Sequence, residues 1–374
     1  LEGGAYFGRV GIKENQWELS NYGSTWTSKM TGIDRSWYSV AMSSDGKIQT
    51  AADNDQFYVS TDYGNSWIPK NISGYWQSVA MSSDGKIQTI VGYQKIYISI
   101  NYGNNWIDKS IGNYLWQSVA MSSDGKIQTI VSGGNDGNLI YVSTDYGNSW
   151  NAKPYADSWH SVAMSSDGKI QTAIGSKNIR ISKNYGNTWY GIKSISGEGI
   201  FFHSVAMSSD GKIQTAVVYG GQIYTSMDYG NNWNIKDFNR KWYSVAMSSD
   251  GKIQTAVVGS TRQEWGGIYI STDYGNTWNA KKSIKSGASV AMSSDGKIQT
   301  AVSHGDMIYV SYADSSIKGN VNIDGIIQSK LNSSVPSTCN STTKGSIALT
   351  SSAKMCICDG SNWVLVNTTT NCTW

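Results

Sequence analysis

Side chains that could carry out acid–base or metal chemistry are few in this chain of 374 residues. The three histidines, His160, His203 and His304, are isolated from one another and fall in different repeat units. A glycosidase needs two facing carboxylates, and no pair of acidic residues stands out. No Ser–His–Asp arrangement, phosphate-binding glycine loop or metal-ligand spacing is evident either. We therefore expect no catalysis, no cofactor and no bound metal.

Four cysteines gather near the C-terminal end, at Cys339, Cys356, Cys358 and Cys372. The spacing lacks the paired knuckles that are usual for zinc, so it favours two disulfides, whose pairing stays open. N-x-S/T sequons add glycosylation candidates, four of them in the same tail: Asn71, Asn332, Asn340, Asn367 and Asn371. Both features favour an extracellular product or one exposed at a virion or cell surface.

Composition excludes several classes of partner. Charged residues are only 15% of the chain and the net charge is +3, too balanced for a nucleic-acid binder. No apolar run approaches the roughly 20 residues of a membrane span. The chain opens at Leu1 without a signal peptide, so we expect a processed or partial product.

One segment, SVAMSSDGKIQT, repeats without change, beginning at Ser39, Ser78, Ser118, Ser161, Ser204, Ser244 and Ser289. Intervals of 39 to 45 residues suit the four-stranded blade of a β-propeller, here all-β with seven blades. In each blade we expect strand A at W-x-SVAMS, strand B at KIQTAVV, strand C at IYVS and strand D from SW or TW. The N-terminal segment, which starts midway through a unit, should supply the outer strand of the last blade. Identity to the last letter exceeds what packing demands, and recent duplication would explain the excess.

A second motif lies between these copies, as STDYGNSW at 60–67 and 143–150 and STDYGNTW at 271–278. It resembles the Asp-box, or BNR, motif of sialidase-like and sortilin-type propellers. The resemblance implies that one residue of each box caps its own turn: Asn21, Asp62, Asn101, Asp145, Asn184, Asp228 and Asp273. It also implies that the box tryptophans pack between blades: Trp26, Trp67, Trp106, Trp150, Trp189, Trp233 and Trp278. Five further tryptophans should form a second packing layer: Trp37, Trp76, Trp116, Trp159 and Trp242.

Catalysis by a sialidase of that family depends on three arginines, a Tyr–Glu pair, an Asp and an Arg-Ile-Pro motif. This chain has only Arg9, Arg35, Arg180, Arg240 and Arg262, and none precedes Ile-Pro. A sialidase-like glycoside hydrolase is therefore the least favoured function.

Propeller topology divides the loops between two faces. The A–B turn is always SSDG and the C–D turn nearly always DYGN, so we call their side the uniform face. The D–A and B–C loops carry the length variation and form the variable face. Diversity on one loop face is typical of recognition, although unconstrained loops also drift. Candidate ligand-binding residues there are Arg262, Glu264, Trp265, Tyr155, Asp157, Arg240, His160 and His203, with Tyr38 and Tyr243 just before an SVAM. Such side chains suit sugar rings and protein partners equally.

The sequence divides into a propeller at 1–312, a linker or shaft-like segment at 313–336 and a Cys-rich β module at 337–374. IKGNVNIDGII resembles the short β repeats of phage and viral fibre shafts, and the last segment resembles terminal modules of fibre-like proteins. In those modules a G-x-I strand pairs with a C-D-G-x-x-W hairpin. The core of this segment is too small to stand alone, so we expect support from disulfides or self-association through the tail.

Together these features favour a non-enzymatic surface or fibre-type protein of a virus, phage or microbe. Its propeller head would bind a glycan or protein receptor through the variable face. The alternative is a structural building block of a fibre, filament or capsid decoration.

Overall fold

The computed structural model describes residues 22–30, 35–134, 139–176, 178–192, 201–260 and 266–313, and three short strands near the C-terminus. Every regular element among these residues is a β-strand, which agrees with the predicted all-β class. Contacts group Leu19–Ala313 into one compact unit, and Leu1–Glu18 with Asp314–Trp374 into another. The sequence placed its first domain at 1–312.

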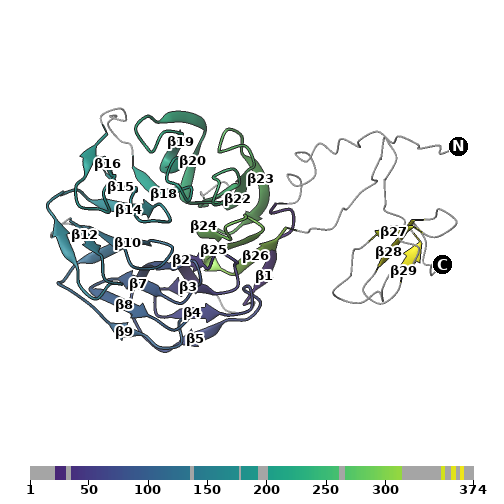
Figure 1. The fold of residues 1–374 in the computed structure, drawn as a ribbon, viewed down its shortest axis with the longest axis horizontal. Helices are drawn as coiled ribbons and strands as arrows, with labels where there is room; N and C mark the ends of the chain where they lie inside the picture. The colour runs from purple at the N-terminus through teal and green to yellow at the C-terminus, as the bar shows by residue number, and fades with distance from the viewer. Residues whose placement is uncertain are drawn as a thin grey trace, which may run out of the picture. The chain divides into compact units, whose positions relative to one another are not determined.

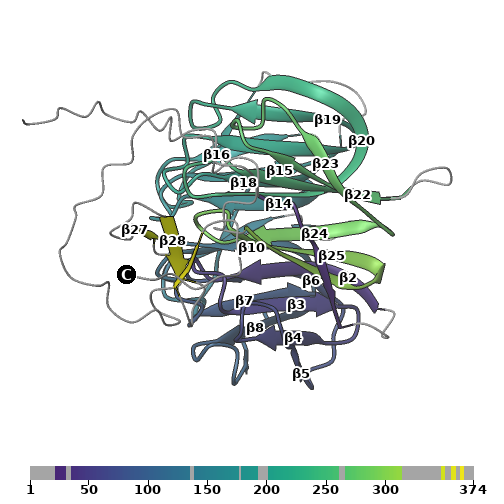
Figure 2. The same ribbon diagram turned by 90° about the vertical axis from the view of Figure 1, so that its right-hand side faces the viewer.

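Each SVAMSSDGKIQT copy forms the innermost strand of an antiparallel unit, the turn after it and the start of the next strand. The units surround a common axis, with the SVAM strands nearest to it (Figure 1). From the side, the strands run between the two loop faces (Figure 2).

Three units are separate four-stranded sheets: β6 (Trp76–Met81), β7 (Gln88–Gly92), β8 (Lys95–Ser99) and β9 (Ile107–Asp108); β10 (Leu115–Met121), β11 (Gln128–Gly133), β12 (Ile140–Ser143) and β13 (Asn151–Lys153); β14 (Trp159–Met164), β15 (Gln171–Gly175), β16 (Ile179–Ser182) and β17 (Tyr190–Gly191). The first unit contains β2 (Arg35–Met42), β3 (Gln49–Asp53), β4 (Phe57–Ser60) and β5 (Ile68–Lys70). The last contains β24 (Gly287–Met292), β25 (Ile298–Asp306), β26 (Ile308–Tyr312) and β1 (Thr27–Lys29).

Two units share one six-stranded sheet, which differs from the predicted set of separate strands. Its strands are β18 (Phe202–Met207), β19 (Gln214–Ser226), β20 (Asn234–Met247), β21 (Gln254–Val258), β22 (Gly266–Ser271) and β23 (Asn279–Ile284). β19 spans the expected strands B and C, and β20 spans a strand D and the next strand A. Pairing continues because Tyr219 lies opposite Lys241 and Gly221 opposite Arg240. Gly220 allows this course, since its φ of 70° is unfavourable for other residues.

The N-terminal strand closes the ring, as the sequence predicts. β1 pairs antiparallel with β26, with Thr27 opposite Val310 and Lys29 opposite Ile308. The last unit is therefore built from both ends of the propeller chain, β1 and β24 to β26, and β26 has no open edge.

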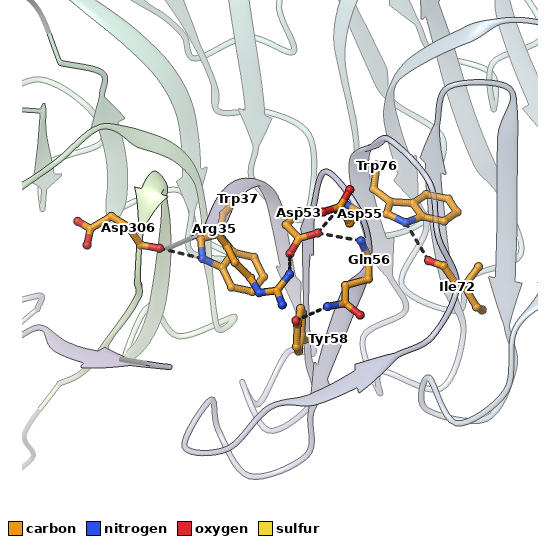
Figure 3. Close-up of polar contacts among 9 residues, drawn as sticks. All are labelled: Arg35, Trp37, Asp53, Asp55, Gln56, Tyr58, Ile72, Trp76 and Asp306. Carbon is orange, nitrogen blue, oxygen red and sulfur yellow. Dashed lines mark hydrogen bonds and ion pairs between the residues drawn. The ribbon is translucent and has the colours of Figure 1, made fainter. Parts of the chain in front are cut away.

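A second link joins the last and first units on the variable face. β2 pairs with β25 through Arg35 and Asp306, and Trp37 Nε1 donates to the Asp306 carbonyl oxygen at 3.1 Å (Figure 3). Arg35 also forms an ion pair of 2.7 Å with the buried Asp53 and lies over the ring of Tyr58. Since Asp53 also accepts two backbone N–H groups, its buried charge is well compensated.

Three closed circles of hydrogen bonds connect neighbouring units around the axis. In the first circle one serine of each SSDG turn donates its N–H to the corresponding carbonyl of the next, at 2.7 to 2.8 Å, through Ser44, Ser83, Ser123, Ser166, Ser209, Ser249, Ser294 and back to Ser44. In the second, each repeat threonine donates to the next repeat glutamine, as Thr50 Oγ1 does to Gln88 Oε1 at 2.6 Å. In the third, each repeat serine accepts the next valine N–H, as Ser39 Oγ does from Val79.

Further contacts give much of the segment a structural role, whereas the expectation that its identity exceeds what packing demands stays a prediction. Within the turn, Ser43 Oγ donates to Asp45 Oδ1 and accepts the Ile48 N–H. A side chain at Gly85 would lie 2.7 Å from Ile48 Cβ of the preceding unit. Most residues of SVAMSSDGKIQT thus contact their own turn or the neighbouring blade, and a substitution removes those contacts.

Apolar contacts occupy the same interfaces. One cluster combines Ala52 and Phe57 of the first unit with Trp76, Val79 and Ile90 of the second. The five tryptophans of the expected second layer are at most 1% exposed, and the box tryptophans of the described residues are buried or half-buried. The core therefore lies between the sheets rather than in one centre.

We expect Gln88→Leu to lower the free energy of unfolding by about 2–6 kcal/mol. The change leaves the Thr50 hydroxyl and the Gly85 carbonyl without their buried partner, at about 1–3 kcal/mol each. Urea unfolding measures the effect. Gln77→Leu, at a half-buried glutamine of the axial cavity, is the matched control and should change stability by less than about 0.5 kcal/mol. Equal effects would show that the Thr–Gln circle contributes no special stability.

Candidate binding site at the axial cavity

The residue just before each SVAM changes from unit to unit, although the segment that follows it repeats. Because it holds the same place in every blade, the ring brings all its copies to the axis. They line a cavity of about 230 Å³ together with His304 and the first serine of each repeat. The variable residues of this lining are Tyr38, Gln77, Gln117, His160, His203, Tyr243 and Ala288.

The sequence-based view that the three histidines are isolated is wrong. All three line this cavity, although they lie in different units. Rings of Tyr38, His304, Tyr243 and His203 follow one another with centroid separations of 4.8, 5.9 and 4.9 Å. His203 Nδ1 also lies 2.7 Å from the Tyr243 carbonyl oxygen, and His160 Nε2 lies 3.0 Å from Ser176 Oγ. Part of the rim is therefore a continuous aromatic chain.

Electrostatics make this cavity a neutral site at physiological pH. Burial lowers the pKa of all three histidines. For His203 the Tyr243 carbonyl opposes this effect, but the neighbouring His160 and His304 lower the pKa further, and burial prevails. Burial and Tyr219 raise the pKa of Tyr243 to about 12. The lining contains no Asp, Glu, Lys or Arg among the described residues. It thus offers uncharged hydrogen-bond donors and acceptors beside aromatic rings.

The cavity at the opposite end of the axis has a lining of a different type. A cavity of about 200 Å³ there is lined by repeated methionines and serines, including Met42 and Ser44 of the first unit. All of these residues belong to the unchanging segment, so this end presents the same groups from every blade.

A groove on the variable face was not predicted. It measures about 520 Å³ and is lined by Tyr75 and Tyr93, which are 64% and 50% exposed, and by polar side chains. Its polar residues are Asn54, Asp55, Ser73, Gln94, Lys95, Asp108 and Ser110. The D–A loop and the two B–C loops that build it are short, so loop length did not reveal it. The sequence signal for this groove was a pair of tyrosines in adjoining loops.

Tyr155, Asp157 and Arg240, which the sequence predicted as ligand-binding loop residues, do not line the axial cavity. Tyr155 lies under the Arg180 guanidinium and accepts the Trp189 N–H, while the buried Asp157 accepts from Asn178. Arg240 lies over the Tyr269 ring. These three side chains therefore take part in packing. Arg262, Glu264 and Trp265 lie outside the described residues.

Box aspartates cap their own turns. Asp62 Oδ1 accepts the Ser66 N–H at 2.8 Å, and Oδ2 accepts the Ser66 hydroxyl. Burial raises the pKa of Asp62, but these hydrogen bonds outweigh it and hold the pKa below its ordinary value. The same contacts recur in the other aspartate boxes, and Asn101 and Asn184 accept the backbone bond through their amide oxygens. Asn21 lies outside the described residues.

Little of the tail is described. β27 (Ile347–Leu349), β28 (Met355–Cys358) and β29 (Trp363–Leu365) form an antiparallel sheet, with Cys358 opposite Trp363. Cys339 and Cys372 lie outside the described residues, as do Asn332, Asn340, Asn367 and Asn371. Asn71 is exposed after β5. In the described part of the chain, no cluster of His, Cys, Asp or Glu could hold a metal, and no helix could span a membrane.

Comparison with known proteins supports the fold. The chain is similar to YCF48 from Cyanidioschyzon merolae, with a TM-score of 0.59 and 15% identity over 77% of this chain and 98% of that one. A structure of YCF48 bound to D1 peptide gives a TM-score of 0.59 and 15% identity over 78% and 97%. The GH74 xyloglucanase from Xanthomonas campestris gives a TM-score of 0.61 and 14% identity over 77% of this chain and 53% of its own length. No family model and no curated protein matches the sequence. Since these neighbours are β-propellers, the radial sheets define a β-propeller.

We expect the melting temperature to fall between about pH 7.5 and pH 5, and to fall less in His203→Gln. Folding lowers the histidine pKa values, so it favours the neutral rings. Their stabilisation is therefore present above the ordinary pKa of about 6.5 and is lost as the pH falls through the folded values. The box aspartates titrate below this range. Differential scanning calorimetry of both proteins provides the test, and superimposable pH profiles would contradict it.

Proposed function

We propose that the chain is a non-enzymatic binding protein whose propeller, of seven Asp-box blades, recognises a receptor with its variable face. The axial cavity is the observation that carries this proposal. Its frame repeats from blade to blade, whereas its lining varies among Tyr, His, Gln and Ala. A packing role alone would favour the same residue at equivalent positions, but a ligand without sevenfold symmetry requires different groups.

A protein receptor that inserts a polar peptide segment is the favoured partner. Gln77 and Gln117 offer amide donors and acceptors that match peptide groups, and the serine hydroxyls can serve either role. Neutral imidazoles and phenols complete a lining that does not select for charge. The structural neighbour YCF48, which is recorded with D1 peptide, provides a precedent for peptide binding by this fold.

A glycan is the second candidate, and the groove on the variable face favours it. Tyr75 and Tyr93 expose broad ring surface, on which the apolar face of a sugar can stack. Asn54, Gln94 and Asp108 surround them with groups that pair with hydroxyls. Both sites lie on the variable face, so one receptor glycoprotein could occupy both.

The tail fits a surface or fibre-type location in this proposal. Two disulfides among its four cysteines would support a module that is small, and self-association would anchor the heads. Such bonds form in oxidising surroundings, so the protein would act outside the cell or at a virion or cell surface.

Binding of the full chain to peptide and glycan arrays tests the proposal. We expect peptide hits whose affinity falls at least about tenfold in the Tyr38→Ala, Tyr243→Ala double variant, because an aromatic anchor is lost on each side of His304. Glycan hits should weaken instead in Tyr75→Ala, Tyr93→Ala. Tyr190→Ala, which removes an exposed ring outside both sites, is the control. Absence of saturable binding, or binding that neither pair affects, would reject the recognition role.

The non-enzymatic part has its own test. We expect no hydrolysis of xyloglucan, sialosides or aryl glycosides by the purified chain, because no facing carboxylate pair stands out in its sequence. Reducing-sugar and chromogenic assays measure this. Turnover that disappears in Glu264→Ala would show that the chain is a glycosidase.

A further inference from the structure

The exposed tyrosines of the C–D turns are not explained by the fold. Six of the seven have a φ between 61° and 64° and are 37% to 42% exposed: Tyr63, Tyr102, Tyr146, Tyr185, Tyr229 and Tyr274. The seventh, Tyr22, is only 8% exposed and packs in a core cluster. Each precedes a glycine that also has positive φ, so the pair forms the centre of a type I′ turn. Asn–Gly is the favoured pair for such turns, and a bulky residue in the left-handed region is strained.

The backbone of these tyrosines has a structural role that any residue could fill. Tyr63 N donates to the Lys47 carbonyl oxygen at 3.1 Å, and the five equivalents do the same in their own blades. This bond holds each C–D turn against the A–B turn of its blade. It places the tyrosines and the SSDGK turns on one face, but it needs no aromatic side chain.

Duplication alone does not explain why the tyrosine is constant. Two residues earlier in the same turns the sequence reads Thr61, Ile100, Thr144, Lys183, Met227 and Thr272. Three residues after the tyrosine it changes among Ser, Asn and Thr. These surface positions have diverged since the copies arose, whereas the strained and exposed tyrosine has not. A constraint therefore acts on the phenol ring itself.

Charges on the same face are balanced within each turn. Every SSDGK turn carries one exposed aspartate, such as Asp45, and one lysine two residues later, such as Lys47. The lysines are exposed except Lys252, which is half-buried. The C–D turns of the same face add Asp62, Asp145, Asp228 and Asp273 and one cation, Lys183, so charges of both signs alternate around the ring with an acidic excess. Opposite charges on two copies can therefore pair, whereas a face of one sign would only repel its copy.

We propose that the uniform face is a self-association surface, on which a second copy of this chain docks face to face. A two-fold axis perpendicular to the propeller axis relates the copies and brings each Asp–Lys turn against its counterpart. Because the SSDGK turn recurs in all seven blades and an exposed turn tyrosine in six of them, a docking that satisfies one pair of these blades also satisfies the others. Weak contacts between tyrosines and between opposite charges are thereby multiplied. A partner without the same repeat could match only part of the pattern. This proposal is independent of the receptor site, which lies on the other face.

Sedimentation of the full chain over a range of concentrations tests this surface. We expect a reversible dimer that weakens as salt is raised. Replacing the six exposed tyrosines by Asn should raise the dimer dissociation constant at least about a hundredfold, because the aromatic contacts of six blades are lost together. Asn suits the left-handed turn, so the melting temperature should hold or rise. The matched control, Tyr75→Asn with Tyr93→Asn, changes two exposed rings of the variable face and should leave the constant unchanged.

A charge variant gives a second measurement if the tyrosine variant does not fold. Glu in place of the seven turn lysines leaves each face acidic and should abolish the dimer, while the aspartate caps stay intact. A monomeric wild-type chain would overturn the proposal. So would an unchanged association constant in both variants, which would assign assembly to the tail, or saturable glycan binding lost in the tyrosine variant while the dimer persists.

Discussion

Closure of a circle is the constraint on which this structure depends. The turn serines form a chain of backbone hydrogen bonds that returns from Ser294 to Ser44, and the Thr–Gln contacts return from Thr300 to Gln49. A linear stack of blades would leave such donors and acceptors unpaired at both ends. Because the polar groups of each SVAMSSDGKIQT segment need a neighbour on either side, the segment is stable only when the last blade meets the first, where β1 completes the last sheet and the pairing of β2 with β25 joins the two units.

The circle of hydrogen bonds also explains how the residues that line the axial cavity can vary while the fold stays the same. Hydrogen bonds fix each inner strand so tightly that the residue before SVAM can change without moving the frame. Tyr38, His203 and Tyr243 therefore face the axis from equivalent places, yet they offer different chemistry. The uniform face shows the reverse pattern, since its turn tyrosines remain constant at positions where backbone geometry favours a smaller residue. Sequence variation between blades therefore distinguishes the axial cavity of the variable face, and a constant turn tyrosine distinguishes the uniform face.

Much of the fold was predictable because its determinants are local. Turn residues, aspartate caps and strand patterns lie within single repeats, and the half unit at the N-terminus predicted that this segment completes the last blade. The sequence left open which of two candidate strands C completes the sheet, and the structure shows that it is β26. The continuous strands β19 and β20 were missed because Tyr219 and Lys241 pair across units. The axial site was misjudged because His160, His203 and His304 lie far apart in sequence and meet only when the ring closes. Their common place before or after the repeated segments was a usable signal, whereas the groove at Tyr75 depends on how loops of two blades adjoin.

The repeated polar contacts have a consequence for the order of the blades. The contact that Gln88 makes with Thr50 is chemically the same as the one that Gln214 makes with Thr172, so the polar groups of each blade edge fit those of every other edge. These contacts do not distinguish one neighbour from another, and blade order depends instead on chain connectivity, on apolar clusters that differ between interfaces and on links such as that of β2 with β25. A gene that gains or loses one repeat therefore still encodes polar partners for each new neighbour.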